Sequence, residues 1–339
     1  MGPGRRNRKD APLVTDRLTD TAFPDADVLT PGRGALDSTA RLPAASEELR
    51  VVSSDEERLE RLTRICVQDV ITAFGLGGVN RGRAVLELFS RMPVRRLARQ
   101  VMSFDKTVGE SGLGTGGAWA LGRMCRNARI EGRSNVPQGG PLLLVSNHPG
   151  LADAVALFAA TPREDLRVIA AARPFLDALP NTSRYLLTVE EDSGGRSGIV
   201  RAAARHLRGG GTVLSFPGGM IEPDPAVLPG AVESLERWSS SADLFARLAP
   251  DLAVVPVVVS GVISAKALRL PLTHLRRRRR DREWLAATLQ MLIPALRDVN
   301  VRVEFGRPIY SGARDGIGQA VIEEARRLME NGLDGRPVK

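Results

Sequence analysis

The sequence predicts an α/β protein with a mostly parallel central sheet flanked by helices and preceded by a small helical subdomain. From Ile130 onward, short apolar runs alternate with longer amphipathic segments, which is the order of βαβ units. The run at 254–259 is apolar at every position, as expected of a strand covered on both faces. Before Ile130 the apolar residues recur only at helical spacing.

Three parts of the chain follow from this pattern. Residues 1–50 are rich in Arg, Asp, Pro, Thr and Gly without a sustained period, which predicts a disordered tail. Residues 51–129 predict the helical subdomain, with a helix that begins near Ser54 and ends at the glycines of 75–78. Residues 130–339 predict the α/β domain that carries the chemistry.

The second predicted helix, over 81–104, is interrupted at Pro93 and carries arginines between its apolar residues. A third follows over 118–128. We expect these helices to be buried against the main domain, and contact with an anionic membrane is the alternative.

The glycines of 112–117 match the G-x-G-x-x-G pattern of dinucleotide sites. That fingerprint requires a strand immediately before it, and the residues of 105–111 are polar. We therefore predict a flexible loop here and keep a nucleotide site only as the alternative.

The α/β domain contains six predicted strands and five predicted helices. The strands are 142–145, 167–171, 185–189, 212–215, 253–259 and 301–305. The helices are 152–160, 195–208, 230–248, 282–296 and 316–329. Pro256 lacks an N–H for the ladder, which predicts a place near a sheet edge or a bulge.

The chain is basic, with a formal net charge of +9 and a pI of about 10.5, and nearly all of its cations are arginines. Arginine binds phosphates and carboxylates well, so an anionic partner is expected, although a coding bias toward arginine is the alternative. Cys66 and Cys125 lie far apart, and the three histidines lack ligand spacing, so neither a disulfide framework nor a metal site is expected. No apolar run is long enough to span a membrane.

The strand predicted at 142–145 leads into Asn147-His148-Pro149-Gly150, and Asp153 falls in the first turn of the next helix. The His148 imidazole would then lie at the carboxyl end of a buried strand, where α/β sheets bind ligands. Asp153 could bond one ring nitrogen, which leaves the other to act as a general base. Because no G-x-S-x-G segment is present, the nucleophile is expected to be a substrate hydroxyl.

His148 and Asp153, with Asn147 before them and Pro149-Gly150 between them, resemble the H-x4-D motif of glycerolipid acyltransferases of the 1-acylglycerol-3-phosphate type. The resemblance covers about 130–309. It implies transfer of a fatty acyl group from acyl-CoA or acyl carrier protein to a hydroxyl of lysophosphatidate or glycerol 3-phosphate. His148 would be the base and Asp153 would orient it, with no cofactor besides the acyl donor.

A second block, Phe216-Pro217-Gly218-Gly219-Met220-Ile221, resembles the family's Phe-Pro-Glu-Gly-Thr-Arg segment, which helps to bind the acceptor's phosphate. Gly218 stands where the family has the acid, and Glu222 is a candidate to replace it. Because the Thr-Arg pair is absent, an acceptor without that phosphate, such as another lysolipid or a polyol, remains open. A glycine-rich loop without substrate contacts is the other alternative.

Further substrate contacts are predicted from single residues. Asn147 and Gly150 flank the catalytic pair, and Arg173, Arg184 and Arg196 are candidates for an anionic head group. Each arginine could instead be a solvated surface residue. Donors for the oxyanion are expected near Gly150 or Gly218-Gly219.

Five arginines, 276–280, follow a leucine-rich stretch. They suit an anionic lipid surface, an acidic carrier protein or the phosphates of coenzyme A, although a solvated charge run is the alternative. Nucleic acid is not expected, since aromatic residues make up only 4% of the chain. We expect a cytoplasmic protein associated peripherally with the cytoplasmic membrane, and a catalytically silent lipid-binding protein is the rival outside enzymes.

Overall fold

The computed structural model of the chain describes residues 45–77, 83–189, 195–313 and 316–334. The chain divides into two compact units, residues 1–41 and 42–339, and every described element belongs to the second. The predicted tail therefore lies outside the described residues except at 45–50, which are helical. The first helix begins at Ala45 rather than near Ser54.

Eight strands form one mixed sheet in the described residues, in the order β1-β7-β6-β2-β5-β3-β4, with β8 also paired to β6. The strands are β1 (Asn127–Glu131), β2 (Leu142–Ser146), β3 (Leu166–Ala171), β4 (Leu186–Val189), β5 (Thr212–Ser215), β6 (Ala253–Ser260), β7 (Asn300–Phe305) and β8 (Ile309–Tyr310). Only the pairings of β6 with β7 and with β8 are antiparallel. The predicted fold class is confirmed, and β1 and β8 were not predicted.

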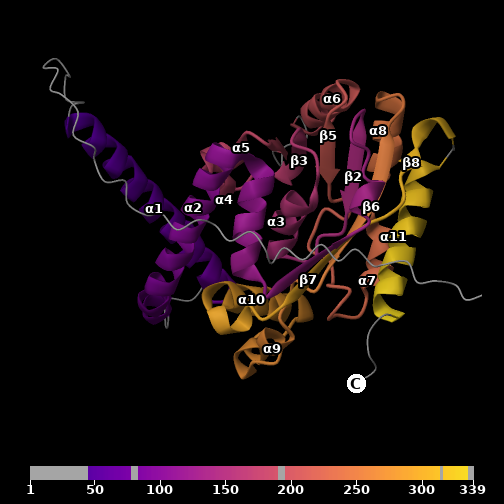
Figure 1. Cartoon of the computed structure of the whole chain (residues 1–339). Helices are drawn as coiled ribbons and strands as arrows, with labels where there is room; N and C mark the ends of the chain where they lie inside the picture. The colour runs from indigo at the N-terminus through magenta and orange to yellow at the C-terminus, as the bar shows by residue number, and fades with distance from the viewer. Residues whose placement is uncertain (1–44, 78–82, 190–194, 314–315, 335–339) are drawn as a thin grey trace, which may run out of the picture. The chain divides into compact units, whose positions relative to one another are not determined.

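Helices pack on both faces of this sheet (Figure 1). The α-helices are α1 (Ala45–Ala73), α2 (Arg83–Met124), α3 (Leu151–Ala160), α4 (Pro174–Asp177), α5 (Pro180–Ser183), α6 (Gly195–Arg208), α7 (Ala231–Ser234), α8 (Ser241–Leu248), α9 (Ala265–Leu268), α10 (Arg279–Leu292) and α11 (Ile317–Asp334). The 3-10 helices are η1 (Arg133–Asn135), η2 (Leu235–Arg237), η3 (Pro271–Leu275), η4 (Pro294–Leu296) and η5 (Ser311–Ala313). The single helix predicted over 230–248 is divided among α7, η2 and α8.

The strand that leads to His148 is buried on both sides. Leu142 and Leu144 pack in one core cluster with α2 and α3, whereas Leu143 and Val145 pack in another with α6, α8 and α11. Alternate side chains of a strand point to opposite faces, so an apolar run without polar alternation requires two covering layers. This double burial fixes the strand and therefore the place where its carboxyl end emerges.

Pro256 lies in β6, an interior strand, so the prediction of a place near an edge or bulge is wrong. The proline is tolerated because, on one side of β6, the paired strand changes from β8 to β7 at this position. β8 pairs with Ala253 and Val254, and β7 pairs only from Val257 onward. On that side no ladder bond requires an N–H at position 256, and the Pro256 carbonyl accepts a bond from Gly306.

The glycine-rich stretch 112–117 is helical rather than a loop, which corrects the prediction. Helix α2 continues through it with one break at Gly112, where φ is 85°. A Cβ at Gly117 would lie 2.8 Å from the backbone of α3, so this glycine allows the two helices to approach closely. Packing of α2 on α3 therefore outweighs the low helix propensity of glycine.

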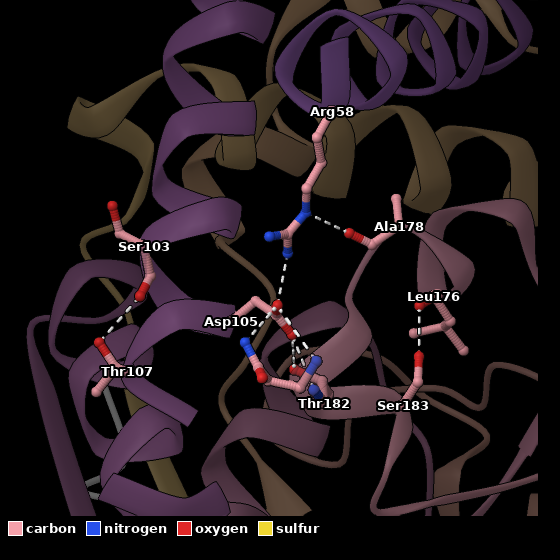
Figure 2. Close-up of polar contacts among 9 residues, drawn as sticks. Arg58, Ser103, Asp105, Thr107, Leu176, Ala178, Thr182 and Ser183 are labelled. Atoms are coloured by element: carbon pink, nitrogen blue, oxygen red, sulfur yellow. Dashed lines mark hydrogen bonds and ion pairs between the residues drawn. The ribbon is translucent and has the colours of Figure 1, made fainter. Parts of the chain in front are cut away.

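The α1–α2 pair is held to the sheet domain by a buried carboxylate. Figure 2 shows Asp105 of α2 between Arg58 of α1 and Thr182 of α5. Asp105 is fully buried, its Oδ2 lies 2.5 Å from Arg58 Nη2, and its Oδ1 accepts from the Thr182 N–H at 2.8 Å and hydroxyl at 2.7 Å. Arg58 also donates to the Ala178 carbonyl at 2.8 Å. One side chain thus links three helices.

Asp105→Ala is expected to lower the free energy of unfolding by about 3 kcal/mol, because it leaves Arg58 without its partner and the Thr182 donors unsatisfied. Urea unfolding of the variant and the wild type measures the difference. Asp177→Ala removes an exposed carboxylate nearby and is expected to change stability by no more than about 0.5 kcal/mol. Equal effects of the two substitutions would contradict a linking role for Asp105.

Candidate functional site

The candidate site lies where three parallel strands end. β2 pairs in parallel with both β5 and β6, so their carboxyl ends reach the same edge of the sheet. His148 follows β2, Phe216 follows β5, and the loop 261–263 follows β6. We call this edge the rim, and the predicted pair lies on it.

His148 and Asp153 form a close hydrogen-bonded pair, with 2.6 Å between Nδ1 of the imidazole and Oδ2 of the carboxylate. A carboxylate accepts, so Nδ1 carries the proton and Nε2 is the basic nitrogen of the neutral ring. The His148 side chain is 29% exposed and the Asp153 side chain is fully buried. The pair therefore has a buried orienting carboxylate and an accessible base.

The Asp153 carboxylate is fixed by the helix that it opens. Its Oδ2 also accepts from the Gly150 N–H at 3.1 Å, and its Oδ1 accepts from the Ala154 N–H at 2.6 Å. The Gly150 N–H is one of the donors that the start of α3 leaves without a helical partner, and the helix dipole favours a negative charge there. The turn geometry thus supplies the orientation that H-x4-D spacing predicts.

Asn147 joins the turn to the neighbouring strand. Its Nδ2 donates to the Val259 carbonyl at 2.9 Å, and its Oδ1 accepts from the Val259 N–H at 2.8 Å. Because Asn147 is fully buried, these two bonds make it a link between β2 and β6 rather than a residue open to substrate. The Phe216 ring packs on the imidazole, with the ring centroids 4.7 Å apart.

Glu222 brackets the backbone of His148. Its Oε2 accepts from the His148 N–H at 2.9 Å, and its own N–H donates to the His148 carbonyl at 2.8 Å. Its Oε1 accepts from Trp238 Nε1 at 2.8 Å and from the Ser234 hydroxyl at 3.1 Å. These contacts place Glu222 directly behind the turn that carries His148.

Asp224, which the sequence analysis did not single out, holds the third part of the rim. This fully buried carboxylate accepts N–H bonds from Gly261, Val262 and Ile263 at 2.7–3.0 Å. Side-chain atoms of Val262 and Ile263 lie 3.7 and 3.8 Å from the point where Gly150 would carry a Cβ. The acid-proline repeat of 222–225 was the only sequence signal for it.

The pKa values of Glu222 and His148 at the rim are both raised. Burial raises the pKa of the Glu222 carboxyl, although its hydrogen bonds with Trp238, His148 and Ser234 oppose this. Burial acts to lower the pKa of His148, but the hydrogen bond and charge of Asp153, together with the charge of Glu222, outweigh it and raise the value above 6.5. The imidazole is therefore a stronger base than free histidine.

The predicted arginines do not gather at the rim. Arg173 is exposed and follows β3, on the same edge as His148. Arg184 is exposed and precedes β4, which runs parallel to β3, so it lies at the opposite edge. Arg196 lies in α6, and its side chain is outside the described residues.

The remaining predicted contacts follow β5. Gly219 adopts φ 62° and its N–H donates to the Phe216 carbonyl at 3.1 Å, which makes a tight turn. Pro217 accepts at its carbonyl from the Ser239 N–H at 3.1 Å. Gly218 faces the Glu222 carboxyl. This block therefore reaches the rim beside His148.

A surface hollow of about 420 Å³ lies elsewhere, at the starts of β3 and β5, and is lined in part by Asp165, His206 and Gly211. His206 there donates to the Asp165 carbonyl at 2.7 Å, a structural bond. Within the described ranges, no cluster of His, Cys, Asp and Glu could hold a metal ion. Among the described helices, none has both the length and the apolarity needed to cross a membrane.

Residues 127–260 match the profile of the protein family described as Acyltransferase. Among solved structures, the chain is similar to the 1-acyl-sn-glycerophosphate (LPA) acyltransferase PlsC from Thermotoga maritima, with 17% sequence identity and a TM-score of 0.43, over 86% of this chain and 100% of that chain. No curated protein sequence matches the chain significantly. The profile match runs from the first residue of β1 to the last residue of β6 and contains the His148–Asp153 pair.

Asp153→Asn is expected to lower the pKa of His148, because it removes the negative charge that stabilises the imidazolium. NMR titration of the imidazole carbons, with His148 assigned by its loss in His148→Gln, measures the shift. The spectra of the variant and the wild type are compared at each pH, with the resonances of His206 and His274 as internal references. An unchanged His148 pKa would show that the carboxylate does not polarise the ring.

Proposed function

We propose, from the acyltransferase-family match over residues 127–260, that the protein transfers a fatty acyl group from a thioester to a hydroxyl of a glycerolipid precursor. The observation that supports this most is the 2.6 Å pair of His148 and Asp153 at the open ends of parallel strands. The donor is acyl-CoA or an acyl carrier protein, and no other cofactor takes part.

In the proposed reaction, Nε2 of His148 takes the proton of the acceptor hydroxyl as its oxygen attacks the thioester carbonyl carbon. The tetrahedral intermediate then collapses, the C–S bond breaks, and the imidazolium returns the proton to the leaving thiolate. Asp153 stabilises the imidazolium while it exists. No enzyme-bound acyl group is formed.

The oxyanion of the intermediate needs donors close to His148. The Gly150 N–H already donates to Asp153, and the Gly219 N–H already donates to Phe216. In the part of the chain that the structure describes, the Gly218 N–H has no such partner, and Gly218 directly follows Phe216-Pro217 on the rim. We assign the Gly218 N–H as an oxyanion donor.

Two acceptor classes follow from the rim. Lysophosphatidate and glycerol 3-phosphate carry a phosphate. Of the three predicted arginines, Arg173 is the one whose described position lies on the same edge as His148, and it is the candidate to bind that phosphate. Met220 and Ile221 favour the second class, a lysolipid or polyol without that phosphate. These apolar side chains, 42% and 43% exposed, occupy the block that binds phosphate in the family.

Membrane attachment is proposed to be peripheral, at the cytoplasmic face. Val85, Leu88, Phe89 and Met92 form the α2 patch, which lies on one side of the first turns of α2 and is 58–75% exposed. Arg91 in the same turns pairs with Glu60 of α1, and Arg96 and Arg99 follow as exposed cations. From Val94 onward the large apolar side chains of α2 are buried or half-buried, so its exposed apolar residues lie in the first turns, with Arg96 and Arg99 close by to contact anionic lipid.

The arginine run supports the same attachment. Leu272 and Leu275 of η3 are 40% and 67% exposed, and Arg277 and Arg278 beside them are exposed as well. Helix α10, which follows, packs against α1 and α2. A catalytically silent lipid-binding protein would use these surfaces equally, so turnover must be measured directly.

His148→Ala is expected to lower acyl transfer by about 10²–10⁴-fold, the usual contribution of a general base. Purified protein is incubated with labelled acyl-CoA or acyl carrier protein and a panel of acceptors with and without phosphate. His274→Ala, which removes an exposed histidine, is expected to retain the wild-type rate. Transfer by His148→Ala at that rate would contradict the proposal, and lipid binding without any turnover would favour the silent alternative.

Leu88→Ser/Phe89→Ser is expected to weaken binding to vesicles of phosphatidylglycerol and phosphatidylcholine, because it removes two exposed apolar side chains that insert between lipids. Sedimentation with the vesicles at increasing salt separates this apolar contribution from the arginine contribution, which salt screens. Tyr310→Ser changes an exposed aromatic residue of β8 and is the control. Equal binding of all three proteins would exclude the α2 patch as the membrane contact.

A further inference from the structure

We infer that Glu222 is a positioning residue that fills the space left by the missing side chain of Gly218 and holds the His148 backbone in place for the acyl transfer proposed above. The inference rests on that function, and it assigns a role to a residue that the sequence analysis placed among the substrate contacts. It also explains how the rim of this chain is built without the acid found in the family's Phe-Pro-Glu-Gly segment.

The first observation is the space beside Gly218. A Cβ built on Gly218 would lie 3.0 Å from Cδ of Glu222 and 3.1 and 3.2 Å from its two carboxyl oxygens. Within one glutamate side chain the Cβ–Cδ distance is about 2.5 Å, so the Glu222 carboxyl carbon lies within about 0.5 Å of the distance that a glutamate at position 218 would give. A glutamate at position 218 could therefore bring its own carboxyl group to the place that the Glu222 carboxyl occupies.

The second observation is that Gly218 does not need to be glycine for its backbone. Gly219 has the left-handed conformation in this turn, with φ 62°, whereas Gly218 does not. Glycine at position 218 is thus explained by the side chain that faces it, because any larger residue would meet the Glu222 carboxyl.

The third observation is what the Glu222 carboxyl binds. Oε2 accepts from the His148 N–H, and Oε1 accepts from Trp238 and Ser234. With the second bond from the Glu222 N–H to the His148 carbonyl, both backbone polar groups of His148 are fixed by one residue. Glu222 is only 2% exposed, so it acts through His148 and not on the substrate.

The charge of Glu222 adds an electrostatic effect to this geometry. It is the second carboxylate after Asp153 whose charge raises the pKa of His148. Loss of that charge with the side-chain shape kept should therefore lower the pKa of the imidazole, an effect that a purely structural role would not produce.

The test is an NMR titration of the imidazole carbons in the full-length chain. Glu222→Gln is expected to lower the pKa of His148 and to reduce kcat about tenfold. Asp224→Asn is the matched control, since it neutralises a buried carboxylate of the same segment that binds the loop 261–263 instead of His148. It is expected to lower stability without lowering the pKa of His148.

A second variant moves the acid. Gly218→Glu/Glu222→Ala places a carboxyl group in the same space from the other position and is expected to recover the raised pKa of His148 and part of the activity. Gly218→Glu alone crowds two carboxyl groups together and is expected to lose activity. Either of two results would overturn the inference. One is a His148 pKa in Glu222→Gln equal to that of the wild type. The other is a His148 pKa in Gly218→Glu/Glu222→Ala no higher than that in Glu222→Ala.

The two proposals can fail separately in these experiments. The titration needs no substrate, so it decides the role of Glu222 whether or not the protein transfers acyl groups. Absence of acyl transfer by the wild type, with the expected titration, would reject the proposed function alone. Normal transfer by the wild type with an unchanged His148 pKa in Glu222→Gln would reject the positioning role alone.

Discussion

The site depends on the hydrogen bond between His148 and Asp153, because that contact fixes which ring nitrogen is basic and how strongly. Neighbouring elements of the structure hold each of the two residues of this hydrogen bond in place. Helix α3 binds the carboxylate through first-turn N–H groups, and Glu222 binds the backbone of His148 on both sides. Asn147 ties the same turn to β6. A chemically simple pair is thus held by three separate parts of the sheet edge.

Glu222 and Asp224 join those parts. The first binds the turn after β2, and the second binds the loop after β6, with a proline between them. Both carboxyl groups are buried, and burial raises the pKa of each, a cost that their backbone N–H bonds oppose. Two carboxyl groups without such bonds would be strongly destabilising there. The segment 222–224 therefore closes the rim from the side of β5.

The sequence predicts well what is local. The six predicted strands and the H-x4-D turn are confirmed. Continuous apolar runs and helix-capping residues determine the structure of the few residues around them, so they can be recognised in the sequence alone. Strand β1 was missed since Asn127–Glu131 has a single strongly apolar residue and lies at the sheet edge, where pairing with β7 defines it. The glycines of 112–117 were assigned to a loop because their packing on α3 is a long-range contact. For the same reason no pattern showed that Arg184 lies at the opposite edge or that the Glu222 carboxyl faces Gly218.

The pH dependence of kcat/KM for acyl transfer by the wild-type protein tests the central claim most directly, when it is compared with the His148 pKa found by NMR. A general base works only when deprotonated, and the pKa of His148 is raised by Asp153 and Glu222. The logarithm of kcat/KM should therefore rise with unit slope against pH below the pKa of His148, which lies above 6.5, and should reach a plateau at higher pH. A rate that is independent of pH through that pKa, or that falls as His148 loses its proton, would contradict the account.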